Sequence, residues 1–278
     1  MAGYVFDLVG KIGSMALIRR EDNDIDYNIF ARIGAQLNPG MIWVTSGATE
    51  IGRIDYIKRT GCELTGILDE IKTDYAAQGQ AILMELYRQF ISPSYGIRQI
   101  LVEHMHFNDH EKRDHIQKLL IRSAQQGTVP IINYNDPVSA LENRKMELSK
   151  LRSSGDEDVV ECVDNDETAS VIAGLVHAKN LLILTSTDGI YSDPKDPSTL
   201  IREISGTDKD ELEKNIRNAQ KSCVGASREG AQGAKAKLEY IIKPALAGTN
   251  VIIGSPKYRI DELVGGSAPA TRIRLLNR

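Results

Sequence analysis

The chain has 278 residues, of which 41% are hydrophobic and 26% are charged, and its formal net charge is −4. A chain of this length buries a substantial core, as one large domain or two smaller lobes. The absence of a strongly basic field argues against nucleic acid as the main partner. No apolar run approaches the roughly 20 residues that a membrane-spanning helix needs, so we expect no membrane association.

The N-terminus and the cysteines indicate a cytoplasmic protein. The first ten residues, MAGYVFDLVG, lack the basic start and long apolar stretch of a signal peptide. The three cysteines are far apart and odd in number, which is typical of reduced thiols in the cytosol; they are Cys62, Cys162 and Cys223.

Apolar strands alternate with amphipathic helices along the chain. In order, the pattern predicts a strand over 4–9, a helix over 26–37, a strand over 41–45, a helix over 73–90, a strand over 98–103, a helix over 109–126 and a strand over 129–132. It continues with a helix over 166–177, a strand over 181–184, helices over 208–220 and 231–247, and a strand over 250–253. This alternation predicts an α/β fold, an α/β/α sandwich around a mainly parallel open sheet.

Residues 139–161 interrupt this alternation with a charged segment that has a Ser-Ser-Gly-Asp turn signal in its middle. An extended hairpin, a helix followed by a turn, and a mobile flap all fit this composition.

Two clusters of Asn and Asp follow or precede predicted elements. PIINYNDPV, residues 130–138, ends a buried strand with Asn133, Asn135 and Asp136. VDNDETASVIAGLV, residues 163–176, places Asp164, Asn165 and Asp166 before an apolar helical pattern. Alone, such residues usually cap helices or form turns. Because ligands gather at the carboxyl ends of strands in open α/β sheets, two clusters of this kind predict a binding site.

Three elements that combine glycine with small or basic residues accompany these clusters. Gly10-Lys11-Ile12-Gly13-Ser14 follows the first strand, and Ser46-Gly47-Ala48 follows IWVT. GAQGAKAKL, residues 230–238, opens a helix; its Lys235 and Lys237 are two positions apart and cannot share a helix face, so at most one points into a site. Free amides and lysines of this kind suit phosphate or carboxylate oxygens.

The predicted buried strand over 181–184 is followed by the polar turn Thr-Ser-Thr-Asp-Gly, residues 185–189. This turn either binds a nucleotide or has no binding role. The chain has no GxxxxGK[ST] P-loop, no protein-kinase HRD or DFG set and no GxSxG elbow. Four histidines lie between positions 104 and 115, but their spacing matches no zinc pattern, and we expect ordinary surface histidines; they are His104, His106, His110 and His115.

Taken together and in order, these elements resemble the amino-acid kinase family, and within it the glutamate 5-kinases. The resemblance runs from KIGS through VTSGA, AAQGQ, PIINYNDPV, VDND and GAQGAKAKL to DELVGGSAPATRI, and so covers almost the whole chain. It implies one kinase domain, with an amino-acid-binding part at about 1–165 and an ATP-binding part at about 166–278. It also implies a homodimer or homotetramer without the C-terminal PUA domain of many glutamate 5-kinases.

The reaction implied by the resemblance is transfer of the γ-phosphoryl group of ATP to the side-chain carboxylate of L-glutamate, the first step of proline biosynthesis. The implied catalytic residues are Lys11, Lys237 and Asp164, and both Asp164 and Asp166 match the positions of the family's organising aspartates. The residues implied for glutamate binding are Ser46, Gly47, Ala48, Asp136 and Asn165. Those implied for ATP are Gly13, Ser14, Thr185, Ser186, Asp188, Gly230, Gly233 and Lys237, with Mg²⁺ bound mainly through the ATP phosphates rather than by protein ligands.

These roles agree with what phosphoryl transfer needs, namely alignment of the reactants and neutralisation of charge on the equatorial oxygens. A carboxylate nucleophile is already an anion, so no general base is required. Residues 139–161 are longer than the usual connection and should border the acceptor pocket. Another amino acid, a carbamate or a phosphate ester as acceptor, or a catalytically silent ligand sensor, therefore stay open as alternatives.

Overall fold

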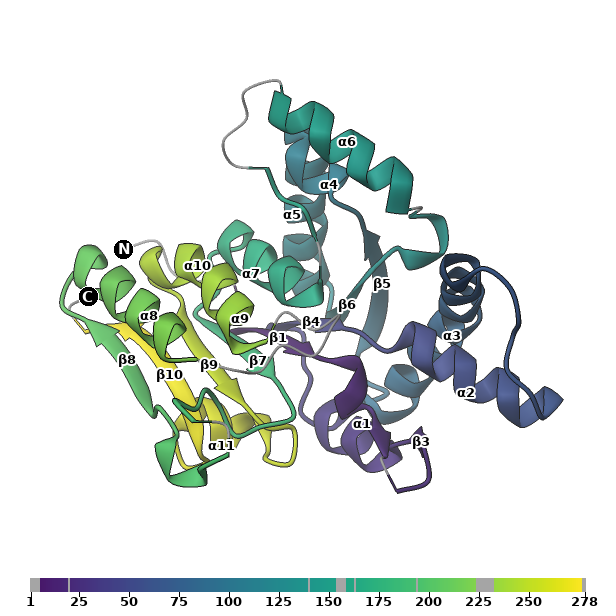
Figure 1. Ribbon diagram of the computed structural model, residues 1–278, viewed down its shortest axis with the longest axis horizontal. Coiled ribbons are helices and arrows are strands. Elements are labelled where there is room, and N and C mark those ends of the chain that lie inside the picture. The colour runs from purple at the N-terminus through teal and green to yellow at the C-terminus, as the bar shows by residue number, and fades with distance from the viewer. Residues whose placement is uncertain are drawn as a thin grey trace. The chain divides into compact units, whose positions relative to one another are not determined.

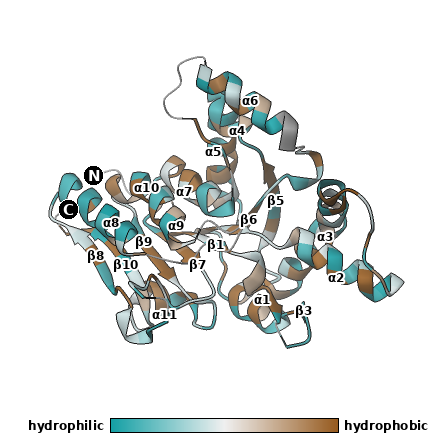
Figure 2. Cartoon of the chain, in the orientation of Figure 1, coloured by the Kyte–Doolittle hydropathy of each residue, from teal (hydrophilic) through white to brown (hydrophobic). Residues whose placement is uncertain are grey.

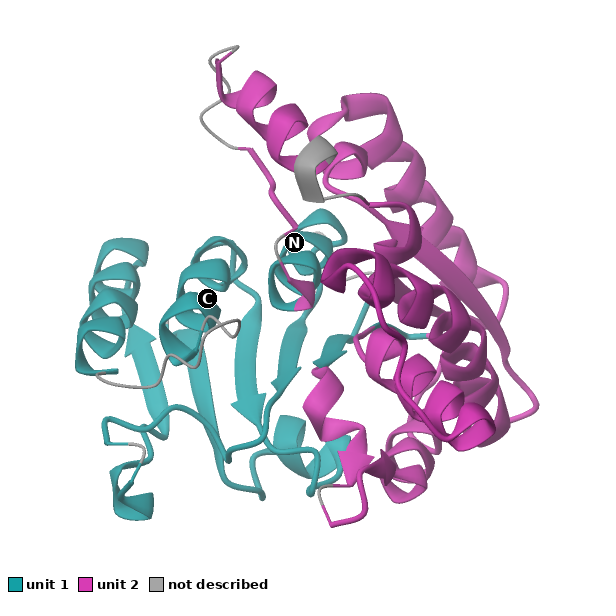
Figure 3. Ribbon diagram, turned by 45° about the vertical axis from the view of Figure 1, so that its right-hand side comes forward, with its two compact units in different colours: residues 1–12, 40–44, 166–278 teal, residues 13–39, 45–165 magenta. Residues whose placement is uncertain are grey.

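The computed structural model describes residues 6–19, 21–139, 141–153, 159–162, 164–193, 195–223 and 233–276, with the backbone alone for 141–143. The chain forms two compact units, shown in teal and magenta in Figure 3. Unit 1 consists of Met1–Ile12, Gly40–Val44 and Asp166–Arg278, and unit 2 of Gly13–Pro39 and Thr45–Asn165.

Unit 1 is built on six strands in the order β4-β1-β7-β9-β10-β8 (Figure 1). They are β1 (Leu8–Ile12), β4 (Met41–Thr45, whose last residue belongs to unit 2), β7 (Asn180–Leu184), β8 (Glu203–Gly206), β9 (Asn250–Gly254) and β10 (Ala270–Leu275). The pairs β1–β7, β7–β9 and β8–β10 are parallel, whereas β9–β10 is antiparallel. Every residue of β1 and β7 is buried, as expected for central strands covered on both faces.

The helices of unit 1 cover this sheet with apolar faces. They are α7 (Asn165–Leu175, whose first residue belongs to unit 2), α8 (Lys209–Ser222), α9 (Ala234–Tyr240), α10 (Ile242–Leu246) and α11 (Ile260–Gly265), with the 3-10 turn η3 (Pro197–Thr199). In α8 the buried residues Leu212, Ile216 and Ala219 recur at helical spacing, and Figure 2 shows the rest of this helix mainly in teal. Asp208 caps α8 by accepting a hydrogen bond from the Glu211 amide at 2.9 Å.

Unit 2 has a parallel pair, β5 (Gly96–Val102) and β6 (Thr128–Tyr134), and a short antiparallel pair, β2 (Ile18–Arg19) and β3 (Asp24–Ile25). Its helices are α1 (Tyr27–Gly34), α2 (Ala48–Thr60), α3 (Leu68–Phe90), α4 (Met105–Asn108), α5 (His110–Gln125) and α6 (Leu141–Ser153), with the 3-10 turns η1 (Ser14–Ala16) and η2 (Asp136–Val138).

Helices α2 and α3 cross at very close range. A Cβ on Gly52 would lie 1.9 Å from the Tyr75 carbonyl oxygen, and one on Gly79 would lie 1.8 Å from that of Ala48. Only glycine fits at these two positions, so α2 and α3 pack backbone against backbone where they cross.

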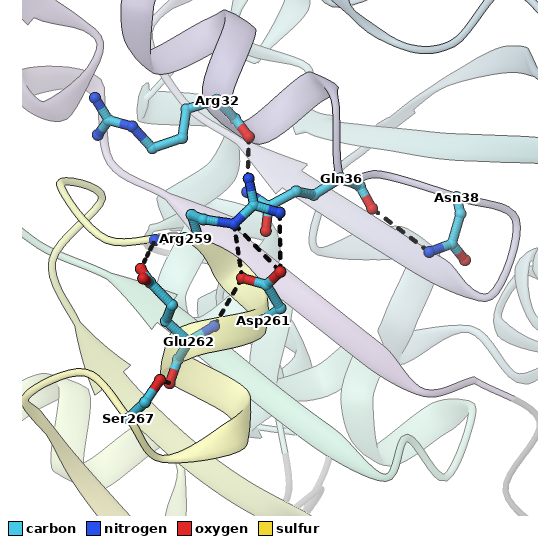
Figure 4. A network of polar contacts seen from close by, with 7 residues as sticks. All are labelled: Arg32, Gln36, Asn38, Arg259, Asp261, Glu262 and Ser267. Carbon is cyan, nitrogen blue, oxygen red and sulfur yellow. Dashed lines mark hydrogen bonds and ion pairs between the residues drawn. The ribbon is translucent and has the colours of Figure 1, made fainter.

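In the network of Figure 4, side chains form hydrogen bonds with backbone groups at the ends of two helices. In unit 1, the Glu262 carboxylate accepts a hydrogen bond of 2.9 Å from the Arg259 backbone amide, where α11 begins. In unit 2, the Gln36 side chain donates to the Arg32 carbonyl oxygen at 2.7 Å just after α1.

The structure confirms the predicted fold class and most elements, with some corrections. The strand at 41–45 matches β4, and the helix at 109–126 matches α5 with Asp109 as its N-cap. The first strand begins and ends later than predicted, so Lys11 lies within β1 and not in a turn, paired in parallel register with Ile183. The predicted helix at 231–247 is split into α9 and α10 in its described part, because Pro244 has no N–H to continue the helix.

Candidate functional site

Two lysines of unit 1 form ion pairs with the same buried aspartate. Lys11 Nζ lies 2.6 Å from Asp166 Oδ1, and Lys237 Nζ lies 2.6 Å from Asp166 Oδ2. The Asp166 side chain is 2% exposed, against 9% for Lys11 and 20% for Lys237. β1, the first turn of α7 and α9 contribute one residue each.

The charge balance of this cluster favours an anion. Burial tends to raise the pKa of Asp166, but the ammonium groups of Lys11 and Lys237 outweigh it and lower the pKa. The carboxylate is therefore ionised and holds both lysines, and the three groups together carry one net positive charge. Fixed cations of this kind, largely out of water, are the groups that neutralise a phosphoryl group during transfer.

The sequence left open which lysine of the AKAK segment points into the site, and the geometry distinguishes them. Lys237 contacts Asp166, whereas Lys235 is exposed. Gly233 is the N-cap residue of α9. Gly230 lies outside the described residues.

The loop after β7 is tied to the loop after β9. The Thr185 amide donates to the Gly254 carbonyl oxygen at 2.8 Å, and the Asp188 carboxylate lies 2.8 Å from Lys257 Nζ. Ser186 is exposed in the same turn. Thr185, Ser186 and Asp188 thus follow a central parallel strand at its carboxyl end, where open sheets bind ligands.

Unit 2 contains a pocket of about 380 Å³. This volume is at the lower end of the roughly 300–1,000 Å³ of small-molecule sites. The pocket is lined by Ser14, Ser46, Gly47, Ala48, Thr49, Glu50, Asn133, Tyr134, Asp136, Arg144, Cys162, Asp164 and Asn165. All five residues predicted to bind the acceptor are in this list. Asp164, predicted as catalytic, and Ser14, predicted on the ATP side, lie here too, while Gly13 is the N-cap residue of η1.

Asn165 is held at the pocket wall by a buried hydrogen-bond network. Its Nδ2 atom donates to the Thr45 carbonyl oxygen at 3.0 Å, to Ser46 Oγ at 2.9 Å and to Asn133 Oδ1 at 3.0 Å. Asn133 in turn donates to Gln80 Oε1 of α3 at 2.8 Å. Asn165 Oδ1 is buried and accepts no hydrogen bond from the described residues. That oxygen can accept a bond from a ligand, since buried acceptors are rarely left unsatisfied.

Asp136 keeps solvent access at the pocket, yet the protein around it makes its charged form costly. This desolvation raises the pKa of Asp136 to about 6, and the nearby Arg144 guanidinium opposes the rise. Near neutral pH the group is mostly an anion, and a cationic ligand stabilises that state further.

The first turn of α2 supplies anion-binding amides to the same pocket. Gly47, the N-cap residue, has a left-handed φ of 104°, which glycine adopts without strain. Ala48, Thr49 and Glu50 follow it along the pocket wall. The amides of a first helical turn lack intrahelical partners and attract carboxylates.

The resemblance implied organising roles for both Asp164 and Asp166, and the structure separates them. Asp166 pairs with the two lysines, whereas Asp164 lines the unit 2 pocket. Arg144 lies in the segment expected to border the acceptor pocket but was not singled out, and Glu50 was not predicted. Three consecutive Asx residues look alike in a sequence, and only the geometry of α7 separates them. The expectation of surface histidines was wrong for His104, which is 2% exposed and lies 3.0 Å from Glu147 Oε2.

Within the described ranges no group of three His, Cys, Asp or Glu side chains could hold a metal ion. None of the helices described is long and apolar enough to cross a membrane.

Comparisons with known proteins show the family to which the chain belongs. A model of the amino acid kinase family matches residues 8–255. The glutamate 5-kinase of Gloeobacter violaceus is 28% identical over 96% of this chain and 68% of its own length, and that of Burkholderia mallei is 30% identical over 96% and 67%.

Solved structures share the fold. The Giardia carbamate kinase superposes with a TM-score of 0.57 at 15% identity, over 99% of each chain. The uridylate kinase of Archaeoglobus fulgidus gives 0.52 at 16% identity, over 96% of this chain and 99% of its own. With the family match over most of its length, the chain belongs to the amino acid kinase family.

Proposed function

We propose that this chain transfers the γ-phosphoryl group of ATP to the side-chain carboxylate of L-glutamate, forming γ-glutamyl phosphate for proline biosynthesis. The Lys11–Asp166–Lys237 cluster is the observation that carries the proposal of phosphoryl transfer. The identity of the acceptor rests on the glutamate 5-kinase relatives and on the charges of the unit 2 pocket.

The pocket suits an acceptor that carries an ammonium group. Asp136 and Asp164 provide two carboxylates, against the single guanidinium of Arg144 among the lining residues. Glu50 also lines the pocket, but its carboxylate is paired with Arg53 at 2.6 Å. A nucleoside monophosphate would bring a dianion to this mainly acidic surface, which costs Coulomb energy. Asp136 and Asn165 Oδ1 are acceptors for the α-ammonium group of an amino acid, and the α2 amides are donors for a carboxylate.

In the proposed reaction a γ-carboxylate oxygen attacks the γ-phosphorus of ATP. The bond from that phosphorus to the β–γ bridging oxygen breaks, and ADP leaves with the electron pair. No proton has to move, because the nucleophile is already ionised. Lys11 and Lys237 neutralise charge on the transferring group, and Asp166 fixes both ammonium groups before the reaction starts.

Mg²⁺ fits this site as a companion of ATP. Both oxygens of Asp166 are occupied by ammonium groups. We therefore propose that Mg²⁺ is bound mainly through the phosphates, where it supplies further neutralisation. Gly13, Thr185, Ser186, Asp188, Gly230 and Gly233 are proposed nucleotide-side residues. We further propose a cytoplasmic homodimer or homotetramer, with residues up to about 165 binding the amino acid and the rest binding ATP.

ADP release measured across a panel of acceptors tests the proposal. The panel contains L-glutamate, L-aspartate, N-acetyl-L-glutamate, carbamate and UMP, each with ATP and Mg²⁺. We expect turnover with L-glutamate and trapping of its product by hydroxylamine. Turnover with carbamate or UMP alone would show that L-glutamate is not the acceptor. No turnover with any member of the panel would favour a ligand sensor.

A further inference from the structure

Arg144 gives the unit 2 pocket a positive charge that the proposed reaction has not yet used. It lies on α6, within the long segment at 139–161, and is half-buried. Among the lining residues it is the one cation, beside Glu50, Asp136 and Asp164.

The guanidinium of Arg144 is held by uncharged partners. Its central carbon lies 5.0 Å from the centre of the Tyr134 ring, and Nη2 donates to the Glu161 carbonyl oxygen at 2.6 Å. No carboxylate of the described ranges forms an ion pair with it, although its charge acts on Asp136. A fork of several N–H donors held in this way matches a carboxylate well.

Helix α6 is fixed on the side from which Arg144 projects. Arg144, Glu147 and Leu148 are three and four positions apart and therefore share a helix face. Leu148 is 7% exposed, and Glu147 contacts the buried His104 at the start of α4, which Figure 1 shows beside α6. Asn108 of α4 also exchanges two hydrogen bonds with the Val160 backbone, at 2.7 and 2.8 Å. The segment that presents Arg144 is thus held against α4 through Glu147 and through the Val160 backbone.

From this arrangement we infer that Arg144 determines specificity by binding the non-reacting α-carboxylate of an amino-acid acceptor. The inference rests on the proposed function. The pocket lining contains neither Lys11 nor Lys237, so the pocket suits the α-amino-acid head of the acceptor, with its one positive and one negative group. Asp136 and Asp164 take the ammonium group. The α2 amides carry only partial charge, roughly half an elementary charge for a whole helix end, and Arg144 supplies the full opposite charge for the carboxylate.

Replacing Arg144 in the protein and the α-carboxylate in the substrate tests this role. L-Isoglutamine carries a neutral amide in place of the α-carboxylate and keeps the γ-carboxylate. Wild-type protein should prefer L-glutamate over isoglutamine. Arg144→Gln should raise the KM for L-glutamate roughly 10- to 100-fold, the range expected for a lost charged hydrogen bond. It should leave kcat within about threefold. It should barely change the KM for isoglutamine, because the neutral α-carboxamide of isoglutamine forms no ion pair with Arg144 that the substitution could remove.

Two further variants separate recognition from folding. Arg152→Gln makes the same change on the same helix at an exposed residue that pairs with the Glu161 carboxylate and does not line the pocket. Its KM values should equal those of the wild type. Arg144→Lys keeps the charge without the fork and should retain most of the preference for L-glutamate.

The outcomes distinguish this inference from the proposed function. If the wild type does not turn over L-glutamate, the proposed function fails and the inference falls with it. If the wild type uses L-glutamate and Arg144→Gln shows the same KM, or raises the KM for both substrates equally, this inference alone is overturned. Melting temperatures measured for all variants show that each is folded under the assay conditions.

Discussion

Asp166→Asn is the substitution with the largest expected effect on both stability and activity. The asparagine has nearly the same shape but no charge, so two ammonium groups that now lie 2.6 Å from a carboxylate lose their counter-ion. The Lys11 side chain is 9% exposed and cannot regain full hydration in place. Removing one partner of a buried ion pair typically costs about 3–5 kcal/mol.

The same substitution should slow the reaction. Without Asp166 the two lysines are no longer fixed where the phosphoryl group accumulates charge. Losing one preorganised group of this kind costs roughly 10²–10³ in kcat, or about 2.7–4 kcal/mol. The KM for L-glutamate should change little, because the pocket that we assign to the acceptor lies in unit 2 and is not lined by Asp166.

Urea unfolding and steady-state ADP release measure the two effects separately. Asp261→Asn is a matched control in unit 1, since that aspartate pairs with Arg259 while both are more than half exposed. Exposed pairs contribute about 0–1 kcal/mol, so this variant should resemble the wild type in stability and turnover. An Asp166→Asn protein with wild-type stability and kcat within threefold would refute the reasoning about the lysine cluster.

Three other results are expected. Lys237→Ala should lower kcat roughly 10²-fold or more, while Lys235→Ala, at an exposed residue, should not; equal kcat values for the two variants would contradict the assignment. The KM for L-glutamate should rise as pH falls through about 6, where the Asp136 carboxylate becomes protonated and can no longer pair with an ammonium group, and Asp136→Asn should remove this dependence. Gly79→Ala should destabilise the protein by at least about 1–3 kcal/mol in urea unfolding, as for overpacking, because its Cβ would collide with the Ala48 carbonyl; wild-type stability would contradict the close crossing.

The sequence contained the fold class because buried strands and amphipathic helices have different periods. Ile42, Trp43 and Val44 form a short apolar run between turn residues, which favours a buried strand, and β4 has the predicted bounds. Helix α2 was not predicted, because its sequence alternates apolar and charged residues without a clear stripe and has glycine at position 52. Its place depends on the crossing with α3, which is a tertiary contact.

The candidate site was predictable as a set of residues but not as an arrangement. Lys11, Lys237 and the Asx clusters could be found from their types and positions. Asp166 could not be separated from Asp164, because side chains two residues apart point in directions that depend on where α7 begins. The segment 139–161 was expected at the acceptor pocket, but Arg144 could not be singled out within it, because the inward face of this charged segment is fixed by contacts with α4.

The central claim is that a carboxylate oxygen of L-glutamate becomes the bridging oxygen of an acyl phosphate. Glutamate labelled with ¹⁸O in its γ-carboxylate, incubated with ATP, Mg²⁺ and hydroxylamine, tests it directly. Hydroxylamine attacks the acyl carbon, so the released phosphate keeps the bridging oxygen. The account predicts one labelled oxygen in each phosphate released together with the hydroxamate. ADP formation with unlabelled phosphate would show that the carboxylate is not the acceptor.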